Sequence, residues 1–250
     1  MMIEILWLIA MLAGLAVWTV RGNRQYAAFK RAEDESRRIA FYRRWTVESF
    51  LLLTGASLIT LLMLGRSDAP FAMPDLFASL AARLPKHDPA PSSDGGALDF
   101  AIGVALALGG VAAVQIYRLR RVVDAITADI EPLFPRSPRE RIAVVPLCLN
   151  AGFSEELFFR LALPLLVADV TGSAAIGFGV ALAAFGLMHA YQGWKGVVGT
   201  TLVGGLLTVH YLQHGALLWL MGVHAAIDLV ALIVRPWIAG RMVGRRAMAA

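Results

Sequence analysis

Three pairs of residues stand one helical turn apart within apolar stretches of the sequence: Glu156 and Arg160, Phe185 and His189, and His224 and Asp228. Residues four positions apart lie one above the other on a helix, so each pair shares one helix face. An ionisable side chain within a membrane costs at least about 2.5–3.5 kcal/mol at the centre of an isolated helix, and it usually faces the interior of a bundle. If the three faces converge, they build one polar pocket.

The first pair is directly preceded by a second acid, Glu155. Two adjacent carboxylates in a pocket of low dielectric constant cannot both ionise cheaply, and Arg160 can hold one of them charged. The other acid is then free to act as a base. Activated water and a stabilised oxyanion are what peptide hydrolysis requires, and carboxylates and imidazoles can supply both. These residue types could supply the chemistry of a hydrolytic site.

The composition indicates a membrane protein. Of the 250 residues, 58% are hydrophobic, and the mean hydropathy of +0.65 lies far above that of soluble domains. Several apolar stretches approach the roughly 20 residues that cross a bilayer as a helix. We therefore expect an all-α, polytopic transmembrane helix bundle of about seven spans, at 3–20, 46–65, 98–117, 142–167, 173–191, 196–212 and 216–234.

The basic residues predict the orientation of these spans. Most of the 23 lysines and arginines fall in the loops 21–45 and 118–141, which lie on the same side of the membrane. Basic loops stay in the cytoplasm, so the N-terminus is expected outside and the C-terminus inside. Because topology explains the net charge of +5, we expect no nucleic-acid partner. The short loops suggest a bacterial inner membrane, with membrane lipid as the surroundings.

A proline- and serine-rich loop at 66–97 divides the predicted chain. Residues 1–97 would form an N-terminal two-span region with a flexible extracytoplasmic loop. Residues 98–250 would form the core that carries the polar pairs. Between these spans, 124–141 is predicted to be an interfacial segment that its prolines interrupt.

The three pairs also match the motifs of a known family. Over about 140–230, the sequence resembles the CAAX-protease and bacteriocin-processing group of intramembrane proteases, which includes the type II CAAX prenyl endopeptidase. The motifs are Glu-Glu-x-x-x-Arg, Phe-x-x-x-His and His-x-x-x-Asn or Asp, and all three occur in order. Asp228 stands where the prenyl endopeptidase has Asn. An ionised Asp cannot donate a hydrogen bond to an oxyanion, so Asp228 would instead orient His224 or be protonated.

The resemblance implies an intramembrane endopeptidase that cleaves a membrane-anchored protein or peptide near the cytoplasmic face. Glu155 and His189 would activate the water, His224 and Asp228 would assist at the oxyanion, and Phe185 would shape the pocket. The resemblance favours a site without a cofactor. Glu155, His189 and His224 would also make an open zinc site of two His and one Glu.

Other interpretations remain open from the sequence alone. The protein could be a non-catalytic, immunity-type membrane protein of the same fold that binds a partner. A proton-coupled transporter would also use buried carboxylates and histidines, although the sequence shows no internal repeat. In the simplest structural interpretation, Glu156 and Arg160 form an ion pair that braces the helices, and His224 and Asp228 do the same through a hydrogen bond.

Overall fold

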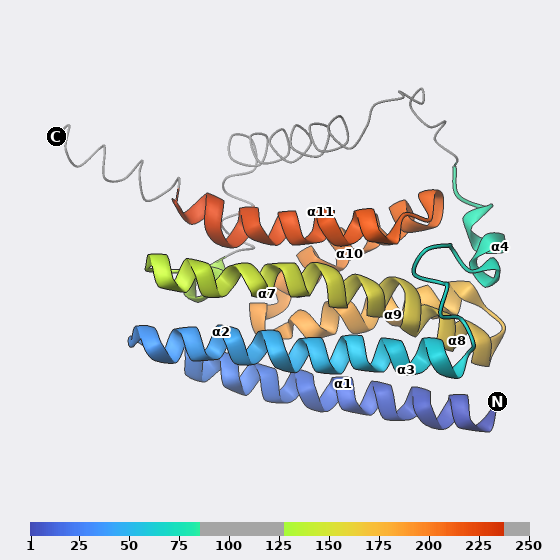
Figure 1. The fold of residues 1–250 in the computed structure, drawn as a ribbon, viewed down its shortest axis with the longest axis horizontal. Helices are drawn as coiled ribbons and strands as arrows, with labels where there is room; N and C mark the ends of the chain where they lie inside the picture. Colours follow the sequence, from blue (N-terminus) through green and yellow to red (C-terminus); the bar gives the residue numbers. More distant parts are fainter. Residues whose placement is uncertain (86–127, 238–250) are drawn as a thin grey trace.

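The computed structural model describes residues 1–85 and 128–237. In these two ranges the chain forms helices and no strand, and the long helices run side by side along one direction (Figure 1). The prediction of an all-α protein is confirmed. Five continuous helical stretches of the described residues are long and apolar enough to cross a membrane: Met2–Phe29, Glu35–Met63, Pro138–Thr171, Ala174–His214 and Leu217–Trp237. These stretches support an integral membrane protein.

The fourth stretch contains two of the predicted spans. Helix α9 (Ala174–Met188) ends in the short 3-10 turn η5 (His189–Gln192), and α10 (Gly193–His214) follows. Gly193 has a φ of +72°, a conformation that glycine adopts without strain and that reverses the chain here. Accordingly, α10 returns along α9, with Gly204 against Phe185. The predicted span 98–117 lies outside the described residues, so the count of seven stays a prediction.

Among the described residues, three helices begin with capping residues that their sequences carry, one of them α9 after Ser173. Helix α2 (Glu35–Ser49) follows Asp34, whose side chain accepts a hydrogen bond from the Ser36 backbone N–H. Helix α7 (Pro138–Glu156) follows Ser137, whose hydroxyl accepts from the Glu140 N–H. The predicted loop 21–45 is therefore largely wrong, because α1 (Met2–Phe29) and α2 fill most of it.

In the described residues, three of the five long helical stretches, called rods below, contain a short π-helical segment, and the one in the fifth is η6 (Val230–Val234). In the second rod, η1 (Phe50–Thr54) joins α2 to α3 (Gly55–Met63). In the third rod, η4 (Leu157–Ala162) joins α7 to α8 (Leu163–Thr171). The wider turn of a π-helix changes the direction in which side chains leave the rod, and such turns are frequent at functional sites.

Helix α7 is central to the bundle and packs closely against α2 and α11 (Leu217–Leu229). A glycine permits the second contact, because a Cβ atom on Gly152 would lie 2.5 Å from the backbone oxygen of Met221. Small residues of this kind let helix backbones approach each other in membranes. Helix α1 packs against α8, α9 and η5, so the N-terminal helices adjoin those that carry the polar pairs. The predicted boundary at 97 and 98 falls outside the described residues and stays a prediction.

A buried ion pair fastens α2 to the beginning of α7. The Arg38 Nε lies 3.0 Å from both carboxylate oxygens of Glu140, and the two side chains are 0% and 2% exposed. The Arg38 Nη2 also donates to the Tyr42 hydroxyl at 2.8 Å and to the carbonyls of Pro132 and Phe134 at 3.0 Å each. These contacts hold η3 (Ala128–Leu133) and the segment after it against the bundle. The predicted interfacial segment thus includes a 3-10 turn that an arginine of α2 anchors.

Candidate active site

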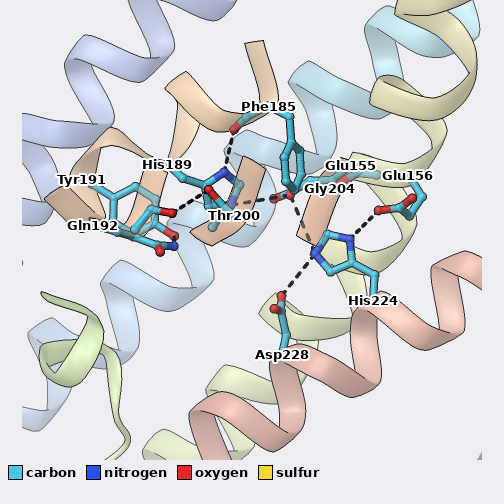
Figure 2. A network of polar contacts seen from close by, with 12 residues as sticks. Glu155, Glu156, Phe185, His189, Tyr191, Gln192, Thr200, Gly204, His224 and Asp228 are labelled. Carbon is cyan, nitrogen blue, oxygen red and sulfur yellow. Dashed lines mark hydrogen bonds and ion pairs between the residues drawn. The ribbon is translucent and has the colours of Figure 1, made fainter. Parts of the chain in front are cut away.

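All seven residues that the sequence singled out lie in one region of the bundle. Helix α7 and η4 supply the acids and the arginine, α9 and η5 supply Phe185 and His189, and α11 supplies the remaining pair. Figure 2 shows His224 between Asp228 and Glu156, with His189 across from it. The convergence that the spacing predicted is therefore present in the structure.

A buried chain of charges supports His224. The Glu156 carboxylate lies 3.1 Å from the Arg160 Nε through one oxygen and 2.6 Å from the His224 Nδ1 through the other. Glu156 is 0% exposed and Arg160 is 1% exposed. Because a carboxylate only accepts, Nδ1 is the donor in this contact. The Nε2 of His224 faces Glu155 instead. Arg160 also donates to the Gly204 carbonyl at 3.3 Å and lies over the Phe185 ring at 4.5 Å.

Glu155 directly precedes Glu156, and its carboxylate faces both histidines. Its Oε2 lies 4.0 Å from the His189 Nε2 and 3.9 Å from the His224 Nε2. Both distances are too long for a direct hydrogen bond, and both are short enough for one water molecule to bridge. All three side chains line a cavity of about 200 Å³, which has room for water. The adjacent acids are thus separated by environment, since one is enclosed in an ion pair and the other borders the cavity.

A backbone contact fixes the hydrogen-bonding roles of the His189 ring. Its Nδ1 lies 2.8 Å from the Phe185 carbonyl oxygen, which can only accept, so Nδ1 carries the proton. In the neutral ring, Nε2 then presents a lone pair to the cavity and to Glu155. The Phe185 ring packs against His189 with 4.7 Å between centroids, which holds the imidazole in place. Because Phe185 lies one turn before His189, it positions the histidine through two contacts, one from its carbonyl oxygen and one from its ring.

Asp228 has a looser relation to His224 than the sequence suggested. Its Oδ2 lies 3.8 Å from the His224 Nε2, beyond hydrogen-bonding distance, and its side chain is 31% exposed. The contact that orients His224 comes instead from Glu156. Asp228 lines the same cavity and adds a carboxylate to it.

The three candidate zinc ligands are spaced more widely than zinc prefers. Ligand atoms at the usual zinc distances of about 2.0–2.1 Å in a tetrahedron lie about 3.3–3.4 Å from one another. The Glu155 oxygen is 3.9 and 4.0 Å from the two imidazole nitrogens. Within 1–85 and 128–237, no group of three His, Cys, Asp or Glu side chains is arranged to hold a metal ion. Glu155, His189 and His224 as they stand do not fit zinc.

The cavity also has walls that the sequence did not reveal. Trp18 and Trp45 of the N-terminal helices line it, together with Tyr191 of η5. Both tryptophans lie near span ends, a position that by itself indicates only anchoring at the membrane interface. Their part in the cavity depends on how α1 and α2 pack.

Comparison with protein-family models identifies the segment that holds this site. Residues 138–230 match the model of the Rce1-like type II CAAX prenyl endopeptidases. Over this segment the chain is similar to that protease family. The match confirms the resemblance, and it includes all seven candidate residues and excludes α1 to α3. Neither the curated proteins nor the solved structures gave a match. The Rce1-like segment, together with the apolar helices, supports an intramembrane protease of the CAAX type at the level of the family.

Proposed function

We propose that the protein is an intramembrane endopeptidase that hydrolyses a membrane-anchored protein with a water molecule held between Glu155, His189 and His224. The observation that carries this proposal is the position of the Glu155 Oε2, within 4.0 Å of the Nε2 atoms of both histidines. A water at that point would have an acceptor for each of its protons. The family match to residues 138–230 supports the same reaction class.

In this mechanism Glu155 is the general base. It takes a proton from the water while the Nε2 lone pair of His189 accepts a second hydrogen bond and orients the attack. The oxygen attacks the peptide carbonyl carbon, and negative charge develops on the carbonyl oxygen. Glu155 then returns its proton to the leaving amine, as a general acid.

His224 would stabilise the oxyanion through its Nε2. Its Nδ1 donates to Glu156 at 2.6 Å, and this buried carboxylate favours a ring that carries a proton on both nitrogens. Arg160 pairs with Glu156 and fixes its carboxylate in position. Asp228, 3.8 Å from Nε2, would act on the same nitrogen through its charge and without a hydrogen bond. The reaction would use no metal, in keeping with the spacing of the candidate ligands.

Cleavage would take place near the cytoplasmic face. The cavity is lined by Leu133 and Tyr191, at the end of the bundle where η3 and η5 lie. The arginines of α2 and of the beginning of α7 gather at that end, which the distribution of basic residues assigns to the cytoplasm. A substrate anchored in the membrane would therefore present its juxtamembrane segment to the site.

The test compares membrane fractions of cells that contain the wild type, Glu155→Gln or Glu131→Gln. Glu131 is an exposed acid in η3 and serves as the matched control. Mass spectrometry of protein termini should show at least one membrane protein whose cleaved form is lost only with Glu155→Gln. If Glu155→Gln retains every cleavage and the biological activity, a partner-binding protein of this fold explains the data instead.

The role of metal is tested on the purified protein. We expect cleavage of the same substrate to be unchanged after prolonged treatment with a chelator, and elemental analysis to find less than one bound zinc per chain. Loss of activity with the chelator, restored by stoichiometric zinc, would contradict the metal-free mechanism.

A further inference from the structure

Helices outside the family match form part of the wall around the candidate active site. Trp18 of α1 and Trp45 of α2 line the same cavity as Glu155 and His189. The matched segment begins only at residue 138. The groups proposed to perform hydrolysis and this part of the wall therefore come from two different regions of the chain.

Ring contacts connect this wall to the histidine of the site. The centroids of Trp18 and Trp45 are 6.5 Å apart, those of Trp45 and Tyr191 5.0 Å, and those of Tyr191 and His189 5.9 Å. We call Trp18, Trp45 and Tyr191 the aromatic wall. Trp45 is only 6% exposed and also packs on Tyr26, which makes this wall a rigid surface beside His189.

The cavity is mostly apolar away from its carboxylates and imidazoles. Aliphatic side chains from η3, α7 and η6 also line it: Ile130, Leu133, Leu147, Ala231 and Leu232. An apolar group that enters gains about 25 cal/mol for each Å² removed from water. One cavity thus offers a polar part for a peptide bond and an apolar part for a neighbouring group.

The volume limits what that group can be. An engineered apolar cavity of about 150 Å³ takes one benzene ring, with six carbon atoms. The present cavity of about 200 Å³ is a third larger. It has room for one large side chain, whereas an isoprenoid chain of fifteen carbons has two and a half times the carbon atoms of benzene. This volume matches one large side chain, and we take a peptide side chain as the occupant to be tested against a prenyl group.

We propose that the aromatic wall selects substrates with a large apolar side chain next to the scissile bond, and that Trp18 and Trp45 determine this specificity. The inference rests on the proposed function and names its substrate class. The substrate is a membrane-anchored polypeptide whose cleavage site carries a residue such as phenylalanine or leucine.

The test uses the full-length protein in lipid nanodiscs and peptides that copy a cleavage site found by terminus mapping. The residue flanking the scissile bond is varied among phenylalanine, leucine, alanine, aspartate and S-farnesylcysteine. We expect kcat/KM for phenylalanine or leucine to exceed that for alanine by about 10- to 100-fold, the range typical of an apolar pocket. Farnesylcysteine should be cleaved no faster than alanine.

Substitution of the wall should remove this preference. Trp18→Ala should lower the ratio of kcat/KM for the phenylalanine peptide to kcat/KM for the alanine peptide by about tenfold, whereas Trp18→Phe should retain most of that ratio. Trp194→Ala is the control, because its ring is 74% exposed and lies outside the cavity lining. Thermal unfolding of each variant establishes that it is folded. An unchanged ratio in folded Trp18→Ala and Trp45→Phe, or a preference for farnesylcysteine, would overturn the proposal.

A second readout is independent of cleavage. Saturation-transfer NMR measures binding of N-acetylphenylalanine amide and N-acetylalanine amide to the Glu155→Gln protein. The aromatic wall predicts a signal for the phenylalanine compound alone, and its loss in Glu155→Gln/Trp18→Ala. Equal signals from both compounds would contradict the proposed selectivity of the aromatic wall, whether or not any peptide is cleaved. Selective binding without cleavage would contradict only the proposed hydrolysis.

Discussion

The described part of the chain contains two buried Arg–Glu pairs, and they serve different purposes. In the pair of Arg38 and Glu140, the arginine also donates to a tyrosine hydroxyl and two backbone carbonyls. These hydrogen bonds hold α2 against η3 and the residues that follow it. In the pair of Arg160 and Glu156, the carboxylate also accepts a hydrogen bond from His224. The preceding residue, Glu155, borders a cavity. The first pair makes only structural contacts and stabilises the packing of segments. The second contacts an imidazole at a cavity, as expected for part of a reactive site.

The largest difference between the two pairs is expected when the glutamate of each pair is replaced by glutamine in a separate variant. Glu156→Gln removes the charge behind His224, and its amide can present the wrong hydrogen-bonding partner to Nδ1. We expect kcat to fall by about 10²- to 10⁴-fold, as when the carboxylate behind a catalytic histidine is replaced by its amide. Glu140→Gln is the matched control and should change kcat by less than about threefold, because Glu140 does not border the cavity. Cleavage rates per folded molecule measure both. Equal losses in the two variants would show that the pairs are equivalent.

The structural role of the Arg38–Glu140 pair is tested by measuring the stability of the protein. Arg38→Met leaves Glu140 buried without its cation, and breaking a buried pair in this way costs about 3–5 kcal/mol. We expect a lower unfolding temperature for Arg38→Met in detergent, followed by tryptophan fluorescence, with the cleavage rate of the folded fraction retained. Arg37→Met, at a neighbouring exposed position of α2, is the control. A stable Arg38→Met protein without activity would assign this arginine to the reaction instead.

Replacing both partners sharpens the distinction. A buried ion pair exchanged for apolar residues of similar size often costs little stability or even adds some. Arg38→Met/Glu140→Leu should therefore recover to within about 1 kcal/mol of the wild type and remain active. Arg160→Met/Glu156→Leu should recover stability and stay inactive, because His224 loses its acceptor. Urea or thermal unfolding, with cleavage measured alongside, separates the two outcomes. Activity in the second double variant would contradict the role of Glu156.

The smallest effect is expected at Asp228. Its oxygen lies 3.8 Å from the His224 Nε2, so Asp228→Asn breaks no hydrogen bond. We expect kcat/KM to change by less than about tenfold, in either direction, which corresponds to less than about 1.4 kcal/mol. Kinetics on the purified variant measure this change. A loss as large as that of Glu156→Gln would place Asp228 in direct contact with the reacting group.

The two pairs also show what the sequence could and could not predict. Glu156 and Arg160 are four residues apart in one helix, so their pairing follows from helical geometry. Arg38 and Glu140 are 102 positions apart, and Arg38 stands among basic residues that only indicate topology. Its burial depends on carbonyl groups that η3 places beside it. Likewise, the contact of Glu156 with His224 joins residues 68 apart and depends on the close approach of α7 and α11 at Gly152.

One feature of the sequence could have corrected the predicted helix boundaries. Ser137, Pro138 and Glu140 have the order of a capping residue, a first-turn proline and the acid of a capping box. The hydropathy pattern placed the helix start at 142, four residues too late, because hydropathy locates the membrane span and not the helix. The aromatic wall had no comparable signal, since tryptophans near span ends are ordinary in membrane proteins.

The most direct test of the central claim follows the water molecule itself. Purified protein in nanodiscs is incubated with its substrate in H₂¹⁸O, and mass spectrometry examines the new C-terminus. Hydrolysis by an activated water predicts one ¹⁸O atom in that carboxylate, with the rate reduced by about 10²- to 10⁴-fold in folded Glu155→Gln and unchanged in Glu131→Gln. Cleavage by Glu155→Gln at the wild-type rate would contradict the account.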